Sequence, residues 1–266
     1  MPKIKVNDIN IFYETFGQGQ PLVLVTGFSA DRLIWQGIVD AYAKHYQVII
    51  VDNRGSGLSD SPDIPYTIEM MADDIVALCK ALSLDRCHFM GTSMGGAIVQ
   101  TLAYKYPQLC RSAIIVNSMS KIDIRFVVFA KGRYELIKAG GFAQAQLEMA
   151  LGIVFSNNYL NKPGIIETFI TAGLASPHPM TAVGYKNQLS ALLGFDSAGW
   201  LHKIKVPCLV TGSDQDGIAT EANMRSIAEQ IPGALYYCFK GVGHLPFIEK
   251  PEEFNKMALA FLKYND

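Results

Sequence analysis

The sequence has no long hydrophobic run, no excess of either charge and no regular cysteine spacing. Its apolar runs stop short of membrane-spanning length, and the first residues, Met-Pro-Lys-Ile-Lys, turn polar without the apolar segment of an export signal. Lys and Arg number 23 against 24 Asp and Glu, so the charge balance does not favour nucleic acid or an anionic membrane. We therefore expect a cytoplasmic protein whose partner is a small molecule, with no nucleic-acid or membrane partner.

The cysteines are odd in number, widely spaced and mostly set in apolar runs, which is typical of buried thiols rather than of disulfides or a metal site. They are Cys79, Cys87, Cys110, Cys208 and Cys238. A chain of 266 residues, 50% of them hydrophobic, is long enough for one sizeable core and a modest additional module. It is short for two independent enzymatic domains.

Short runs of β-branched or large apolar residues recur along the chain, and they predict buried parallel strands. They are residues 22–25, 48–51, 87–90, 113–116 and 208–210. Segments with helical apolar spacing lie between them, and residues 3–16 alternate around Asn7-Asp8 as in an antiparallel hairpin. The sequence thus predicts an α/β fold with a mostly parallel central sheet and helices on both faces, in which ligands bind at the carboxyl ends of the strands.

This alternation stops over residues 121–200, where helical segments are separated by Gly, Pro and Asn pairs. It resumes at Val206 and ends with an amphipathic helix that has Pro251 in its first turn. We therefore expect a core domain of residues 1–120 and 201–266, interrupted by a helical cap, or lid, of residues 121–200.

The segment Gly91-Thr92-Ser93-Met94-Gly95-Gly96 follows one of these strands and precedes a helix. A lone G-x-S-x-G is weak evidence, but a nucleophile elbow needs this strand-turn-helix setting because the serine must lie on a strained bend. The backbone amide of Met94 would then donate to an oxyanion. The alternative is an ordinary glycine-rich turn in which Ser93 caps the helix.

A second glycine turn, Thr26-Gly27-Phe28, follows the strand at 22–25. Here the Phe28 amide would be the second oxyanion donor, because Gly27 lets the backbone approach a tetrahedral intermediate. A plain strand-to-helix turn explains this stretch equally well when it is taken alone.

A serine nucleophile needs a base, and His244 is the best of the five histidines because it lies in the loop Gly241-Val242-Gly243-His244 just before the last helix. His88 falls within a strand, where a core histidine is expected. His45 and His202 are expected at the surface, and His178, between two prolines of the cap, fits either a substrate contact or a loop role.

The third member must be a carboxylate that orients the histidine, and it should lie between a late strand and His244. Asp214 and Asp216 both qualify. We favour Asp216 because it leads into the next helix, the loop position where this acid is usually found. The order Ser93, Asp216, His244 is that of α/β-hydrolases and differs from those of chymotrypsin and subtilisin.

Together these motifs resemble the α/β-hydrolase superfamily, in its branch of 3-oxoadipate enol-lactonase-like enzymes and esterases. Asp52-Asn53-Arg54-Gly55-Ser56-Gly57-Leu58-Ser59 resembles the family's D-x-R-G-x-G-x-S turn, and Gly243-His244 with Glu249 and Pro251 resembles its G-H...E-x-P ending. The resemblance implies that Asp52 and Arg54 hold loops together. This sequence departs from the family pattern at Thr26, where many members have histidine.

Ser93 suits esters, lactones, thioesters or carbon–carbon bonds next to ketones, because a serine forms an acyl-enzyme. We expect an ester or lactone hydrolase, and no metal or organic cofactor is needed. The alternatives are a carbon–carbon hydrolase of the meta-cleavage type, a slow-turnover small-molecule receptor, and a perhydrolase.

The cap does not decide the substrate. Arg125, Lys131 and Arg133 suit an anionic enol-lactone, whereas a stretch such as 126–130, with Phe142, Leu147 and Met149, suits an acyl chain or simply forms the core of the cap.

Overall fold

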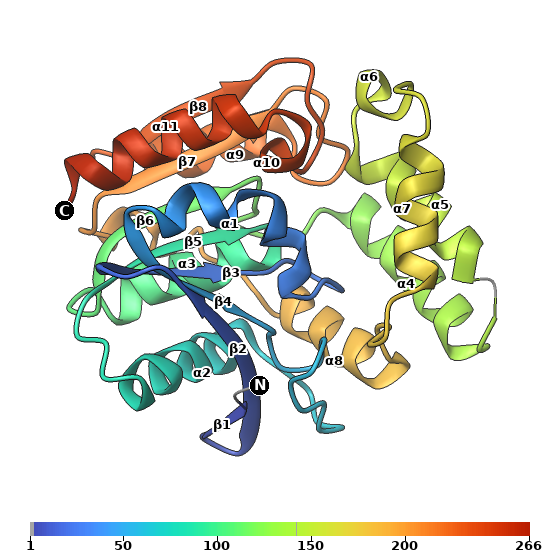
Figure 1. The fold of residues 1–266 in the computed structure, drawn as a ribbon, viewed down its shortest axis with the longest axis horizontal. Helices are drawn as coiled ribbons and strands as arrows, with labels where there is room; N and C mark the ends of the chain where they lie inside the picture. Colours follow the sequence, from blue (N-terminus) through green and yellow to red (C-terminus); the bar gives the residue numbers. More distant parts are fainter. Residues whose placement is uncertain (1–2, 142) are drawn as a thin grey trace.

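The computed structural model describes residues 3–141 and 143–266. Its centre is an eight-stranded sheet with the strand order β1-β2-β4-β3-β5-β6-β7-β8 (Figure 1). The strands are β1 Lys3–Val6, β2 Ile9–Phe16, β3 Gln20–Val25, β4 Tyr46–Val51, β5 Cys87–Thr92, β6 Cys110–Val116, β7 Cys208–Ser213 and β8 Leu235–Phe239. Every run that the sequence marks as a strand lies inside one of them.

The edge hairpin and the parallel sheet both form as predicted. β1 and β2 pair antiparallel around the turn at Asn7 and Asp8, and β2 then pairs antiparallel with β4. From β4 to β8 all neighbouring strands are parallel. Their carboxyl ends consequently meet at one edge of the sheet, where the loops after β3, β5, β6 and β7 lie together.

Helices cover both faces of the sheet because alternate strand residues point to opposite sides. In β3, Val23 and Val25 pack with α2 (Ile68–Ala81), α3 (Met94–Lys105) and α9 (Glu221–Gln230). Leu22 and Leu24 pack instead with α1 (Gln36–Ala43), α10 (Pro246–Glu249) and α11 (Pro251–Tyr264). The alternation therefore produces two hydrophobic layers, one on each side of the sheet.

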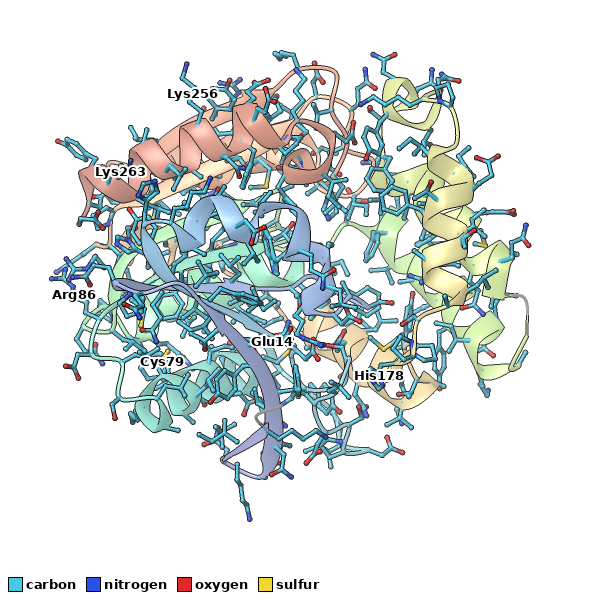
Figure 2. All side chains as sticks on the ribbon, viewed as in Figure 1. Glu14, Cys79, Arg86, His178, Lys256 and Lys263 are labelled. Atoms are coloured by element: carbon cyan, nitrogen blue, oxygen red, sulfur yellow. The ribbon has the colours of Figure 1, made fainter. Side chains whose placement is uncertain are left out.

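Side chains divide between these layers and the surface as their chemistry requires. Figure 2 shows Cys79 inside the molecule, whereas Lys256 and Lys263 extend outward from α11. All five cysteines are free, and four of them are buried while Cys238 is partly exposed. No helix within the described ranges is both long enough and apolar enough to cross a membrane.

Between β6 and β7 the described residues form five α-helices, called the cap below, and Figure 1 shows α4 to α7 beside the sheet. They are α4 Ile124–Lys138, α5 Ala143–Val154, α6 Asn157–Leu160, α7 Ile165–Leu174 and α8 Ala182–Leu193. The two ends of the insertion meet, since Lys121 and Asp196 form an isolated β-bridge and a 3.0 Å ion pair.

Helix α8 connects the insertion to the core. Its Tyr185 and Leu189 pack with Ala130 of α4, whereas Ala191 and Leu192 join the hydrophobic layer of α2 and α3. Two short 3₁₀ turns, Arg32–Trp35 before α1 and Leu201–Lys203 before β7, complete the described elements.

Candidate active site

Ser93 lies on a strained bend between β5 and α3, with φ 55° and ψ −121°. This region of backbone space costs a residue other than glycine about 1–3 kcal/mol, and such strain gathers at functional sites. Glycine is required on both sides of the bend, because a Cβ on Gly91 would lie 2.2 Å from the Gly95 carbonyl oxygen and one on Gly95 would lie 2.2 Å from that of Val25. The sequence G-x-S-x-G therefore fits this turn for steric reasons.

Backbone contacts hold Ser93 while leaving its hydroxyl free. Its amide donates to the Val116 carbonyl at 2.9 Å, and its carbonyl accepts from the Ser118 hydroxyl at 2.7 Å. The Ser93 side chain makes no capping bond to α3. The hydroxyl is thus available for other chemistry, in contrast to the helix-capping alternative.

The amides of Phe28 and Met94 both lie beside Ser93. Gly27 packs on Ser93 so closely that an added Cβ would lie 3.1 Å from the Ser93 Cβ, and Met94 is the first residue of α3. Within the described part of the chain, neither amide donates a hydrogen bond. Two unused backbone donors near a serine are what an oxyanion hole requires.

Thr26 anchors the loop that carries Phe28. Its hydroxyl and carbonyl oxygens each accept a hydrogen bond of 3.0 Å from the Asn53 amide group. The threonine at this place, where the family pattern often has histidine, is therefore fixed through a partner of its own.

His244 and Asp216 form a buried pair, with 2.8 Å between His244 Nδ1 and Asp216 Oδ2. The other carboxylate oxygen, Oδ1, accepts from the amides of Ile218 and Ala219 at 2.7 and 2.9 Å. These donors favour the ionised form of the carboxylate and fix its orientation. The bond at Nδ1 leaves Nε2 of His244 to act as a base.

Asp214 lies elsewhere, although it is only two residues away. It is exposed, accepts from the Gly241 amide at 2.7 Å and lies 3.9 Å from the Lys240 ammonium. Of the two acids left open by the sequence, the structure brings Asp216 to His244.

Asn117 is a site residue that the sequence did not reveal. It follows β6 with φ 41°, and its amide nitrogen lies 3.0 Å from Asp216 Oδ2 and 2.8 Å from the Ser213 hydroxyl. Its position directly after a central strand was the only available signal. Many loop residues follow a strand in this way, so the sequence alone does not predict the contact between Asn117 and Asp216.

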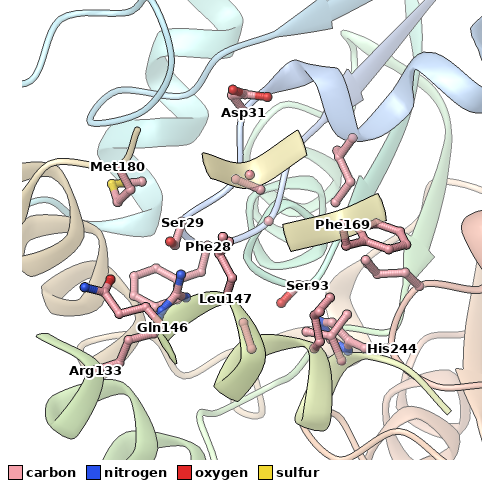
Figure 3. A pocket seen from close by; sticks show the side chains of 18 of the residues that line it. Phe28, Ser29, Asp31, Ser93, Arg133, Gln146, Leu147, Phe169, Met180 and His244 are labelled. Carbon is pink, nitrogen blue, oxygen red and sulfur yellow. The ribbon is translucent and has the colours of Figure 1, made fainter. Parts of the chain in front are cut away.

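Ser93 and His244 line one cavity of about 480 Å³, and Figure 3 shows their side chains next to each other. No hydrogen bond joins the two side chains within the described structure. Such catalytic contacts often shorten only when substrate is bound. The cavity lies between the carboxyl edge of the sheet and the cap, so that α4, α5 and α7 form its outer wall.

The cap contributes mostly apolar groups to this cavity. Phe126, Phe129 and Leu147 line it, whereas Met149 is exposed and Phe142 lies outside the described residues. Of the three cap cations, Arg125 binds Asp123 and Lys131 is exposed, while Arg133 faces the cavity.

The other histidines serve different roles. His88 is buried and contacts the Ser112 hydroxyl at 2.7 Å and Asp266 at 3.0 Å, as expected for a core histidine. His45 and His202 are exposed. His178 is exposed as well, but it is one of the residues that line the cavity.

Asp52 and Arg54 tie loops together outside the cavity lining. Asp52 accepts from the Arg32 amide at 2.8 Å and from the Leu58 amide at 2.9 Å, and Arg54 forms two hydrogen bonds with Asp74. Among the described residues, no group of three His, Cys, Asp or Glu is arranged to hold a metal ion.

Comparison with known proteins agrees with this architecture. The family model for the alpha/beta hydrolase fold matches residues 20–251. A relative, 3-oxoadipate enol-lactonase 2 of Acinetobacter baylyi, is 28% identical over 98% of this chain and 96% of its own length. Pyrrolizixenacetamide deacetylase of Xenorhabdus hominickii is 29% identical over 100% and 99%.

A solved structure is also similar along its whole length. The enol-lactonase from Burkholderia xenovorans LB400 superposes with a TM-score of 0.89 at 28% identity, covering 98% of this chain and 100% of that one.

Proposed function

The chain belongs to the alpha/beta hydrolase fold family, and from that premise we propose that it is a serine hydrolase that cleaves a small carboxylic ester or lactone through an acyl-enzyme on Ser93. Hydrolytic activity is the common theme of its family and of the relatives named above. The bond that is cleaved and the residues that cleave it are part of the proposal.

The proposed mechanism has four steps. His244 Nε2 takes the proton of the Ser93 hydroxyl, and the serine oxygen attacks the substrate carbonyl. The amides of Phe28 and Met94 stabilise the negative charge on the carbonyl oxygen, and one such donor is worth about 3–4 kcal/mol. The imidazolium then protonates the leaving alcohol oxygen. Water, deprotonated by His244, finally releases the acid and restores Ser93.

One observation carries this proposal: a strained serine and a histidine fixed by a carboxylate border the same cavity. A structural glycine turn requires neither the unused hydroxyl nor two unused amides. A buried His–Asp pair is common in protein cores, but such a pair does not usually open onto a cavity next to a strained serine.

The five free cysteines support the proposed cytoplasmic location, because unpaired thiols suit a reducing compartment. The proposed partner is a small ester or lactone, for which a mostly apolar cavity of this volume is well suited.

The test is a hydrolysis panel of p-nitrophenyl esters and lactones together with a fluorophosphonate probe. We expect multiple turnovers and a single adduct on Ser93, with both lost in Ser93→Ala. Ser226→Ala is the matched control, because Ser226 is an exposed serine on α9. Wild-type turnover by Ser93→Ala would overturn the proposal. A burst that stops after about one equivalent of product would favour the receptor alternative instead.

A further inference from the structure

We propose that Arg133 of the cap binds a carboxylate group of the substrate, at the end of the cavity away from His244. This inference rests on the proposed hydrolase function and narrows it. The substrate is an ester or lactone that also carries a free carboxylate, joined to the scissile carbonyl by a short apolar spacer.

Arg133 has no anionic partner among the described residues. Its guanidinium makes no ion pair there, and its Nε atom is buried without a hydrogen-bond partner. Arg133 is partly buried, whereas the two fully buried arginines are paired: Arg32 with Glu14 and Asp52, and Arg54 with Asp74. Arg111 is likewise partly buried with an unpartnered Nε among the described residues, but it does not line the cavity, whereas Arg133 does.

The guanidinium of Arg133 lies against an aromatic wall. The Arg133 Cζ lies 5.5 Å from the centre of the Tyr185 ring, and that ring packs against Phe28 at 4.5 Å and Tyr134 at 6.3 Å. A cation held over a ring face keeps its donors free for another group. Arg133 is thus positioned before any ligand binds.

The charge of Arg133 also lacks a counterion among the described residues. Burial lowers the pKa of the Arg133 guanidinium from its ordinary value, and only the nearby Tyr185 hydroxyl opposes the shift. The group stays charged at neutral pH, because arginine does not lose its proton in proteins. A desolvated charge without a counterion lowers stability, and a carboxylate bound in a bidentate manner would supply the missing counterion.

Two further polar side chains lie on the same side of the cavity as Arg133. Figure 3 shows Ser29, Gln146 and Arg133 on the side of the cavity away from His244. Within residues 3–141 and 143–266, the Ser29 hydroxyl is buried without a hydrogen-bond partner, and Gln146 is held by a 2.8 Å bond from its Nε2 to the Gly141 carbonyl. The Ser29 hydroxyl is a free donor for the same carboxylate.

The rest of the cavity limits the ligand to one anionic group. Phe126, Phe129 and Leu147 make the wall apolar, so the spacer between the carboxylate and the ester is a hydrocarbon chain. Asp31 lines the same cavity and would repel a second anion.

The test compares two p-nitrophenyl esters of equal length, the neutral pentanoate and the glutarate half-ester, which ends in a carboxylate. We expect the wild-type kcat/KM to be at least tenfold higher for the glutarate half-ester. Arg133→Gln should abolish this preference, mainly through KM, and Arg133→Lys should retain part of it. Lys131→Gln is the matched control, because Lys131 is an exposed cation on the same helix, and its preference should equal that of the wild type.

Measurements of ligand binding and of thermal stability test the carboxylate site separately from the proposed hydrolase function. Calorimetry should show that the binding affinity for pentanoate falls in Arg133→Gln, whereas the binding affinity for pentanamide does not change. Arg133→Gln should melt no lower than the wild type, because it removes a partly buried charge that has no counterion among the described residues. Equal kcat/KM values for the two esters would overturn the carboxylate site and leave the hydrolase intact. Failure to hydrolyse either ester, with pentanoate binding still dependent on Arg133, would overturn only the hydrolase.

Discussion

The Ser156 amide donates a hydrogen bond of 3.0 Å to the Glu249 carboxylate and so joins the cap to the loop of His244. The same carboxylate oxygen accepts from the Gly243 amide at 2.9 Å. One residue further on, the His244 amide donates to the Val154 carbonyl of the cap at 2.6 Å. The end of α5 and the chain that follows it therefore form the support on which the histidine loop rests.

Glu249→Ala should lower both stability and activity. It leaves the buried amides of Ser156 and Gly243 without an acceptor, and each unsatisfied group costs about 1–3 kcal/mol. We expect unfolding in urea to be easier by about 3 kcal/mol and kcat to fall at least tenfold. Glu249→Gln keeps an acceptor oxygen and should lose much less. Equal losses in both variants would show that the charge matters rather than the hydrogen bonds.

Replacing the two neighbouring aspartates should give very different results. Asp216→Asn removes the charge that orients and stabilises the His244 ring, and comparable changes in serine proteases cost about 10⁴-fold in kcat. Asp214→Asn keeps an oxygen for the Gly241 amide, so its kcat/KM should stay within about threefold of the wild type. Steady-state hydrolysis of one p-nitrophenyl ester measures both. The reverse order would transfer the role to Asp214.

The sequence predicts those structural elements that are determined by residues close together in the chain. A strand such as β3 is recognisable because its apolar residues are consecutive, and the elbow at Ser93 is recognisable because its glycines are sterically required. Contacts between distant segments have no such local signal. The bond from Asn117 to Asp216 joins residues 99 positions apart.

The cap illustrates the same limit. Arg133 is one of three cations that the sequence offers, and nothing in its neighbours distinguishes it from Lys131. Only the packing of α4 on α8 places it over Tyr185 and away from every described carboxylate. Which cation faces the cavity is therefore a tertiary property.

Asn117→Gly should lower activity while keeping the backbone. Glycine accepts the φ of 41° at this position, but it removes the donor that holds Asp216 Oδ2. Because two backbone amides still fix Oδ1, we expect a roughly tenfold loss in kcat rather than the loss caused by Asp216→Asn. A kcat equal to that of the wild type would mean that those amides orient the carboxylate alone.

His88 should make the folded state less stable in acid. Burial lowers the pKa of His88 below its ordinary value of 6.5, the Asp266 carboxylate opposes this shift, and the cations Arg111 and Arg86 add to it. Below about pH 6.5 the unfolded chain therefore takes up a proton that the folded chain still rejects, so stability falls as the pH decreases through this window. For one proton the slope is at most about 1.4 kcal/mol per pH unit.

Urea unfolding of the wild type and His88→Gln at pH 5.5, 6.5 and 7.5 isolates this contribution. Other groups titrate equally in both proteins, so the difference in unfolding free energy reports His88 alone. The wild type should be the more stable protein at pH 7.5, because glutamine cannot reproduce both ring contacts with Ser112 and Asp266. That advantage should shrink toward pH 5.5. An advantage that grows in acid would mean that the ring is protonated in the fold and pairs with Asp266, which would reverse the sign of the pKa shift.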